Sequence, residues 1–232
     1  FIFFITIILS GNRMPLLLFL FAGSLIIIFN KQTRKFFLPT LIVATIIFYI
    51  FINFNSKVYE NFRAFYDQIS KMTVIVLDKD LKNNYVPPYL RQFLTFYDTW
   101  LMHKYIGGGI KNFRYYCHER PNIDKNSKSI CNMHPHNYYL EILTETGIVG
   151  FSLIALAFLI IIHLTLIKKY FLTSALNKNK VIVPFIFLFL VEIFPIKSTG
   201  SFFTTGNATY LFIIIGILIG LMRKENLIEN KY

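Results

Sequence analysis

Long, nearly uninterrupted apolar blocks constrain this chain more than any other feature. Counting a partial first one there are six, at Phe1–Leu9, Met14–Phe29, Phe36–Ile52, Ile148–Ile167, Val181–Ile196 and Thr209–Met222. A soluble domain spaces its apolar residues periodically, whereas continuous runs are typical of membrane spans. We therefore predict an all-α polytopic membrane protein, a transmembrane helix bundle. Phe1 lies inside an apolar run and no initiating Met precedes it, so we expect a truncated first span with earlier spans before it.

The basic residues predict the orientation of these spans. Alternate connections hold ten of them, namely Lys31, Arg34, Lys35, Lys168, Lys169, Lys178, Lys180, Arg223, Lys224 and Lys231. The opposite short connections hold Arg13 and Lys197. Because cytoplasmic loops concentrate positive charge, the larger set and the C-terminus are predicted to face the cytoplasm. The turn at residues 10–13, the loop at Lys197 and residues 53–147 are then predicted to face outward.

This topology divides the chain into three parts. Residues 1–52 form the first spans, residues 53–147 a large and mostly helical outward segment, and residues 148–232 three C-terminal spans with a cytoplasmic tail. The outward segment carries 12 Lys and Arg against 9 Asp and Glu. So small an excess over such a length predicts no nucleic-acid binding.

Two helices are predicted within the outward segment. The first follows Ser56 as a candidate cap, with Val58, Phe62, Phe65, Tyr66, Ile69 and Met72 at helical spacing. The second follows Pro87-Pro88 and places Arg91 in its first turn. Arg91 is then either an anion site beside exposed backbone N–H groups or a solvated residue on an amphipathic helix. Gly107–Gly109 lack the Lys-Ser/Thr of a phosphate-binding loop and are interpreted as a flexible stop.

Cys117 and Cys131 enclose a polar loop in the same segment. In an oxidising compartment they are expected to form a disulfide. Free thiols are one alternative. A metal site is another because His118, His134 and His136 are near in sequence, although the spacing matches no familiar zinc pattern.

The most specific signal is Met133–Phe151, which reads MHPHNYYLEILTETGIVGF. Asn137 is a plausible N-cap for a helix, and Gly147 permits a break before the next span. His136 then lies at the outer end of this helix. A histidine in such a place is either structural or catalytic.

The run from His136 to Gly150 resembles the C-terminal signature of the O-antigen ligase family. That family includes lipopolysaccharide ligases, Wzy-type glycan polymerases and protein O-oligosaccharyltransferases. Two weaker features are similar to the family as well. Ser10-Gly11-Asn12-Arg13 resembles its Ser/Thr-Gly-Ser-Arg turn, with Asn12 in place of serine. Arg91 resembles the arginine that precedes its Trp and glycines, although the usual Pro-Leu before the glycines is missing here.

The resemblance implies a GT-C-like, metal-independent, inverting glycosyltransferase without a cofactor. The donor would be a glycan on a polyprenyl diphosphate, and the acceptor a hydroxyl on the lipid A core, another glycan or a protein. Arg13 and Arg91 would bind the diphosphate, because guanidinium groups bind phosphate oxygens in two-pronged fashion. His136 would accept the proton of the acceptor hydroxyl. The site would face the periplasm from the bacterial inner membrane.

The roles of two acidic residues and the functional class of the protein are left with alternatives. Glu145 matches the acid of the signature and is expected either to orient a substrate hydroxyl or to face water. Asn137 is a second residue that would orient a substrate hydroxyl. Glu192 lies inside an apolar block and is expected either to be functional or to pair with Lys197. A transporter would concentrate charges within the spans, whereas the polar chemistry here is predicted to lie outside them. A receptor or scaffold would leave the pattern of Arg13, Arg91 and His136 unexplained.

Overall fold

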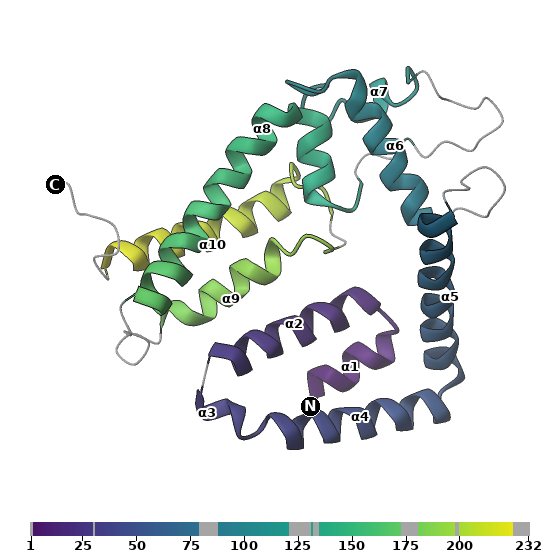
Figure 1. Ribbon diagram of the computed structural model, residues 1–232, viewed down its shortest axis with the longest axis vertical. Coiled ribbons are helices and arrows are strands. Elements are labelled where there is room, and N and C mark those ends of the chain that lie inside the picture. Colours follow the sequence, from purple (N-terminus) through teal and green to yellow (C-terminus); the bar gives the residue numbers. More distant parts are fainter. Residues whose placement is uncertain are drawn as a thin grey trace. The chain divides into compact units, whose positions relative to one another are not determined.

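The residues that the structure, a computed structural model, describes are predominantly helical (Figure 1). Those residues are 2–29, 31–78, 88–120, 131, 135–172, 181–197 and 200–224. They contain no strand, and the all-α prediction is confirmed. The chain divides into two compact units, residues 1–90 and 91–232. Each is described by itself.

The described residues of the first unit form five helices. They are α1 (Ile2–Ser10), α2 (Arg13–Phe29), α3 (Lys31–Arg34), α4 (Phe37–Phe54) and α5 (Ser56–Asp78). The short helix α1 packs against α2, α4 and α5. Its buried residues Phe4 and Ile8 form a core with Val58 of α5 and with apolar side chains of α4. Arg34 closes the other end of α2, because its guanidinium donates to the backbone oxygens of Ile27 and Ile28.

The start of α5 corrects a local prediction. Ser56 is the first helical residue, and the cap is Asn55, whose Oδ1 accepts a hydrogen bond from the backbone N–H of Val58 at 3.2 Å. Asn55 also ends α4, where its extended backbone turns the chain. One asparagine therefore ends one helix and begins the next.

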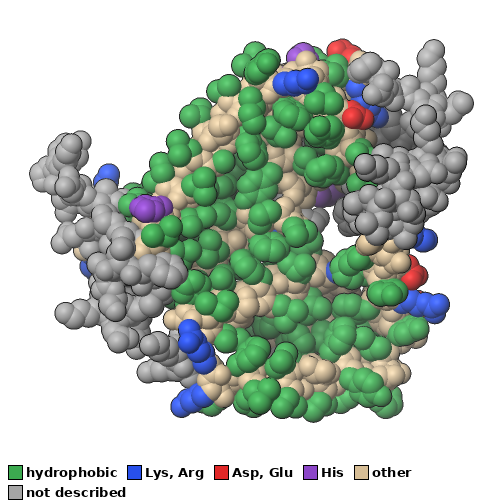
Figure 2. Space-filling view, in the orientation of Figure 1, with side chains coloured by type: hydrophobic (Ala, Val, Ile, Leu, Met, Phe, Trp, Pro, Cys, Tyr) green, Lys and Arg blue, Asp and Glu red, His purple; other side chains and the backbone are tan. Residues whose placement is uncertain are grey.

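The surface of α4 is apolar on all sides. No residue of this helix is buried, and its exposed side chains include Leu38, Leu41, Ile42, Ile46 and Ile50. In Figure 2 hydrophobic side chains cover its visible face, and Lys or Arg side chains lie where α3 is found. A helix of this kind needs lipid or other apolar neighbours around it.

The second unit contains the remaining helices. They are α6 (Pro88–Met102, of which residues from Arg91 belong to this unit), α7 (Phe113–Tyr116), α8 (Tyr138–Ile162), the π-helical η1 (His163–Leu172), α9 (Ile182–Glu192) and α10 (Thr205–Lys224). Helices α9 and α10 pack together. Phe158 of α8 contacts Phe189 of α9 edge-to-face. A hydrophobic core of this unit consists of Phe96, Phe113, Cys117 and Leu140. The rings of Phe96 and Phe113 are stacked.

Among the described residues, three helical stretches are long and apolar enough to cross a membrane. They are Phe37–Phe54, Tyr138–Ile167 and Thr205–Lys224, while Arg13–Phe29 and Ile182–Glu192 are shorter. The fifth apolar block, Val181–Ile196, is helical only as far as Glu192, where α9 ends. Pro195 explains this end, since the residue before a proline is disfavoured in helical conformation.

A break at Gly147 divides α8 into two halves. Gly147 has φ 65° and ψ −170°, which is essentially a glycine-only conformation. Residues 104–109 fill the break with four backbone hydrogen bonds. Gly108 and Gly109 donate to the oxygens of Thr144 and Glu145, and Ile148 and Val149 donate to the oxygens of Lys104 and Tyr105. The groups that a helix break leaves unpaired are thereby satisfied on both sides.

The glycine triplet is therefore not the flexible stop that was predicted. A Cβ on Gly107 would lie 2.3 Å from the backbone carbon of Glu145, and a Cβ on Gly147 would lie 2.2 Å from the backbone oxygen of Tyr105. Two chain segments approach so closely here that neither position has room for a side chain. The triplet is a packed part of the fold, and it fixes the first half of α8.

Candidate active site

The turn before α2 presents Arg13. Gly11 has φ 62° and its N–H donates to the backbone oxygen of Ile8, while the hydroxyl of Ser10 accepts from the N–H of Asn12. A Cβ on Gly11 would lie 2.1 Å from the side-chain nitrogen of Asn61. The tight turn and the closeness of α5 explain why glycine precedes Asn12 and Arg13.

The guanidinium of Arg13 lies against α5. Its Nη1 donates to Oε1 of Gln68 at 2.8 Å, and its Nη2 donates to the backbone oxygen of Asn61 at 2.9 Å. Its central carbon lies 5.1 Å from the ring centroid of Phe65. Sequence reasoning identified Arg13 but missed these partners. The spacing of Asn61, Phe65 and Gln68 on one helix face is the signal that was available.

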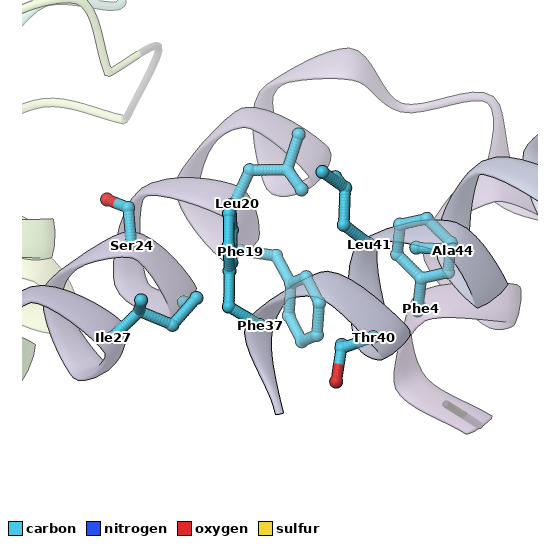
Figure 3. Close-up of a pocket in the computed structure, with 10 residues that line it drawn as sticks. Phe4, Phe19, Leu20, Ser24, Ile27, Phe37, Thr40, Leu41 and Ala44 are labelled. Carbon is cyan, nitrogen blue, oxygen red and sulfur yellow. The ribbon is translucent and has the colours of Figure 1, made fainter. Parts of the chain in front are cut away.

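An apolar hollow of about 260 Å³ lies in the same unit (Figure 3). Residues of α1, α2 and α4 line it, and they include Phe4, Phe19, Leu20, Ile27, Phe37 and Leu41. Among the described residues that line it, Ser24 and Thr40 are the ones with polar side chains. Helix α2 thus carries Arg13 at its first residue and the wall of an apolar hollow further along.

Arg91 is exposed in the first turn of α6, which begins at Pro88 as predicted. The backbone oxygen of Arg91 accepts a hydrogen bond from the hydroxyl of Thr95. The same helix presents Phe96 and Thr99 to the interior of the second unit. The side chain of Arg91 is therefore exposed on a helix whose Phe96 and Thr99 are buried in the second unit.

His136 is an exposed residue in a left-handed backbone conformation, with φ 52°. Histidine is among the few residue types that tolerate this region. Buried Pro135 precedes it and Asn137 follows it. The predicted N-cap at Asn137 is confirmed, because its Oδ1 accepts from the backbone N–H groups of Tyr139 and Leu140. His136 thus occupies a sharp, capped corner at the start of α8.

The connection between α9 and α10 holds the first turns of α8. Asn137 donates from Nδ2 to the backbone oxygen of Pro195 at 2.8 Å. The hydroxyl of Tyr138 donates to Glu192 at 3.0 Å, and the hydroxyl of Tyr139 donates to the backbone oxygen of Ile193. Side chains that follow His136 are thus bound to α9 and to this connection, which fixes the backbone beside His136.

Two acidic residues complete this interface. Glu192 forms an ion pair with Lys197 at 2.5 Å, which is the pairing that was one of the two expectations for it. Glu141 is 1% exposed and accepts hydrogen bonds from the hydroxyl of Ser201 and the N–H of Phe202. Sequence reasoning gave Glu141 and Ser201 no role. Glu141 lies four residues after Asn137 and therefore on the same side of α8.

Glu145 lies one turn further along and does not face water, so that expectation is wrong. It is 2% exposed, and neither carboxylate oxygen has a hydrogen-bond partner within 3.5 Å in the described part of the chain, although the backbone N–H and the charge of Lys111 act on it from further away. A buried carboxyl group without a partner costs folding free energy. Such a cost is characteristic of groups kept for function.

Cys117 and Cys131 form a disulfide with a Cα–Cα distance of 5.6 Å. Both thiols are used in this bond, so the metal-site and free-thiol alternatives do not hold for them. His134 lies outside the described residues. The bond joins Cys131 to the core around Phe96 and Phe113. Arg120 is buried beside it and donates to Sγ of Cys117 at 3.2 Å. Burial lowers the pKa of Arg120, and the charge of Asp98 opposes that shift.

A sequence model described as O-antigen ligase matches residues 1–155. The chain belongs to the O-antigen ligase family. The match includes Arg13, Arg91, His136 and the packed break at Gly147, and it ends within α8. The connection that holds the signature helix, between α9 and α10, lies beyond the matched residues. No curated protein and no solved structure matches the chain.

Proposed function

We propose that this family member transfers a glycan from a polyprenyl-diphosphate donor to an acceptor hydroxyl on the periplasmic side of the bacterial inner membrane. The observation that carries the proposal is the start of α8. Asn137, Tyr139 and Glu141 are bound to the α9–α10 connection and Tyr138 to the last residue of α9, so the capped corner that presents the exposed His136 is fixed. That arrangement is suited to a reactive imidazole on a fixed support.

In the proposed reaction the acceptor oxygen attacks the anomeric carbon of the donor sugar. His136 takes the proton of the attacking hydroxyl, and the bond between the anomeric carbon and the phosphate oxygen breaks. The configuration at the anomeric carbon is inverted. The leaving diphosphate is stabilised by Arg13 and Arg91, whose guanidinium groups supply positive charge and N–H donors to phosphate oxygens. These residues carry out the chemistry without a metal or another cofactor.

The donor is amphipathic, and the first unit has features for both of its parts. Arg13 is at the first residue of α2, and the apolar hollow is lined by later residues of the same helix (Figure 3). At about 1.5 Å per residue, Phe19 lies about 9 Å along α2 from Arg13. This supports binding of the diphosphate at Arg13 with part of the polyprenyl chain in the hollow.

Surface glycan profiling of cells that carry His136→Ala in the full-length gene tests the proposal. Loss of all polymer on lipid A, with polymer accumulating on the polyprenol carrier, is expected for a ligase, which is the function we propose. Lipid A with a single repeat unit and no long chains would instead identify a Wzy-type polymerase. Loss of glycan from proteins alone would identify a protein O-oligosaccharyltransferase.

His163→Ala is the matched control for this experiment. His163 is exposed at the other end of the helix that begins after His136, and its replacement is expected to leave the glycan profile unchanged. An unchanged profile in His136→Ala cells, with normal amounts of the protein in the membrane, would contradict the proposal. The rival interpretation as a transporter would then be preferred.

Glu145 is buried and lies about 13 Å along α8 from His136 at about 1.5 Å per residue, so it does not contact the hydroxyl that His136 deprotonates. We propose that its carboxyl group instead supports the active conformation of the signature helix, and this gives a separate prediction. Glu145→Met removes a buried carboxyl group that has no hydrogen-bond partner within 3.5 Å in the described residues, and it keeps the side-chain length. We expect the variant to be more stable by about 1–3 kcal/mol and less active in glycan transfer. Its melting temperature in detergent and its transfer rate would be measured together.

Glu119→Met is the matched control, because Glu119 is an exposed acid in the same unit. Its stability is expected to change by less than about 0.5 kcal/mol, and its activity to stay the same. A more stable Glu145→Met protein with full activity would show that Glu145 has no part in the reaction.

A further inference from the structure

Three neutral groups on one face of α5 hold the guanidinium of Arg13. They are the side-chain oxygen of Gln68, the backbone oxygen of Asn61 and the ring of Phe65. These residues are spaced by four and three positions, so they form one stripe along the helix. The same face that packs near the turn at Gly11 therefore also orients Arg13.

The charge of Arg13 is not neutralised by this arrangement. Among the described residues, its guanidinium donates hydrogen bonds to a side-chain amide and a backbone carbonyl and lies near an aromatic ring. Glu60 and Asp67 directly precede Asn61 and Gln68 in sequence, but both are exposed, and adjacent helical positions do not face each other. Two of the five N–H groups of a guanidinium are used. Three donors and a full positive charge are left for an anion.

A glutamate at position 68 would hold the guanidinium at least as firmly, because a charge-assisted hydrogen bond is stronger than a neutral one. It would also neutralise the charge that an anionic ligand needs. Glutamine accepts a hydrogen bond without adding a charge. Glutamine at position 68 therefore favours binding of an anionic ligand, whereas glutamate would favour the stability of the ligand-free protein.

We infer that Gln68 is a positioning residue that orients Arg13 toward the diphosphate of the donor while leaving its charge available. The inference rests on the proposed function. It goes further by assigning a role to α5, the first helix of the predicted outward segment. It also states which property of residue 68 matters, namely a neutral hydrogen-bond acceptor.

The test compares Gln68→Glu with Gln68→Ala in the full-length protein in lipid nanodiscs. Binding of radiolabelled geranylgeranyl diphosphate reports the diphosphate site without requiring transfer. Gln68→Glu is expected to weaken this binding by about tenfold or more, because it neutralises Arg13. Gln68→Ala is expected to weaken it by only about threefold, because it loses orientation but keeps the charge. Thermal stability is expected to follow the opposite order.

A purely structural role for Gln68 predicts the reverse order of binding. Gln68→Glu would then bind the probe as well as the natural protein, and Gln68→Ala would be the weaker variant. That outcome would overturn the inference. The matched control is Ser70→Glu, which adds the same charge at an exposed position on α5 and is expected to change binding by less than twofold.

Two further variants keep the test decisive. Ala64→Glu adds a carboxylate one turn before Gln68, at an exposed position, and is expected to weaken binding even if Gln68→Glu does not fold. Arg13→Ala is expected to abolish binding. If it does so while the carboxylate variants bind normally, the inference fails and the proposed role of Arg13 stands. If Arg13→Ala binds normally, the proposed role of Arg13 fails as well.

Discussion

Replacing His136 by asparagine is expected to lower the rate constant of transfer by about 10² to 10⁴. Asparagine tolerates the left-handed backbone that His136 adopts, at φ 52°. Its amide forms hydrogen bonds but cannot accept a proton from the acceptor hydroxyl. The Michaelis constant for the donor is expected to change little, because the arginines that bind the diphosphate are intact.

The measurement is steady-state transfer by the purified full-length protein in nanodiscs, with a polyprenyl-diphosphate glycan as donor. His136→Ala is made in parallel and is expected to be equally slow, although alanine is strained at this φ. Near-normal activity of His136→Asn with loss of activity in His136→Ala would show that the residue supports the backbone corner and is not the base. Equal melting temperatures for His136→Asn and the natural protein would exclude loss of fold as the cause of a slow rate.

Gly147→Ala is expected to have the largest effect on folding. The new Cβ would lie 2.2 Å from the oxygen and 2.3 Å from the carbon of the Tyr105 backbone, and neither atom can move aside as a side chain does. The conformation of Gly147 itself costs another residue about 1–3 kcal/mol. Separating the two segments would also break hydrogen bonds worth about 0.5–1.5 kcal/mol each. We expect a loss of about 3 kcal/mol or more and little monodisperse protein after extraction.

Gly216→Ala is the matched control for this prediction. Gly216 lies in α10, and a Cβ built on it meets nothing within 4 Å. Alanine favours a helix over glycine by about 1 kcal/mol, so this variant is expected to be as stable as the natural protein or more stable. Size-exclusion profiles and melting temperatures compare the two. A Gly147→Ala protein that melts with the natural protein would show that the break at Gly147 does not depend on the packing of residues 104–109.

The local features of α8 were predictable because they depend on short-range rules. Asn137 caps the helix as its residue type and place suggest, and Gly147 breaks it. The helix that begins at Pro88 follows from proline's preference for the first turn. The cap of α5 was misassigned by one residue, because Asn55 and Ser56 are both good caps and only the hydrogen bond to Val58 distinguishes them.

The apolar blocks and the signature at residues 133–151 determined the helical membrane class, the family and the candidate residues without a structure. Each depends on residue type and spacing along the chain, which the sequence states directly. Only the tertiary structure decided what holds these residues. The contacts of Gln68 with Arg13, of the α9–α10 connection with the residues after His136, and of the glycines packed at Gly147 join residues that are 36 to 61 positions apart. The burial of Glu145 likewise appears only in the folded chain. Contacts of that kind depend on how helices meet, and no local pattern encodes them.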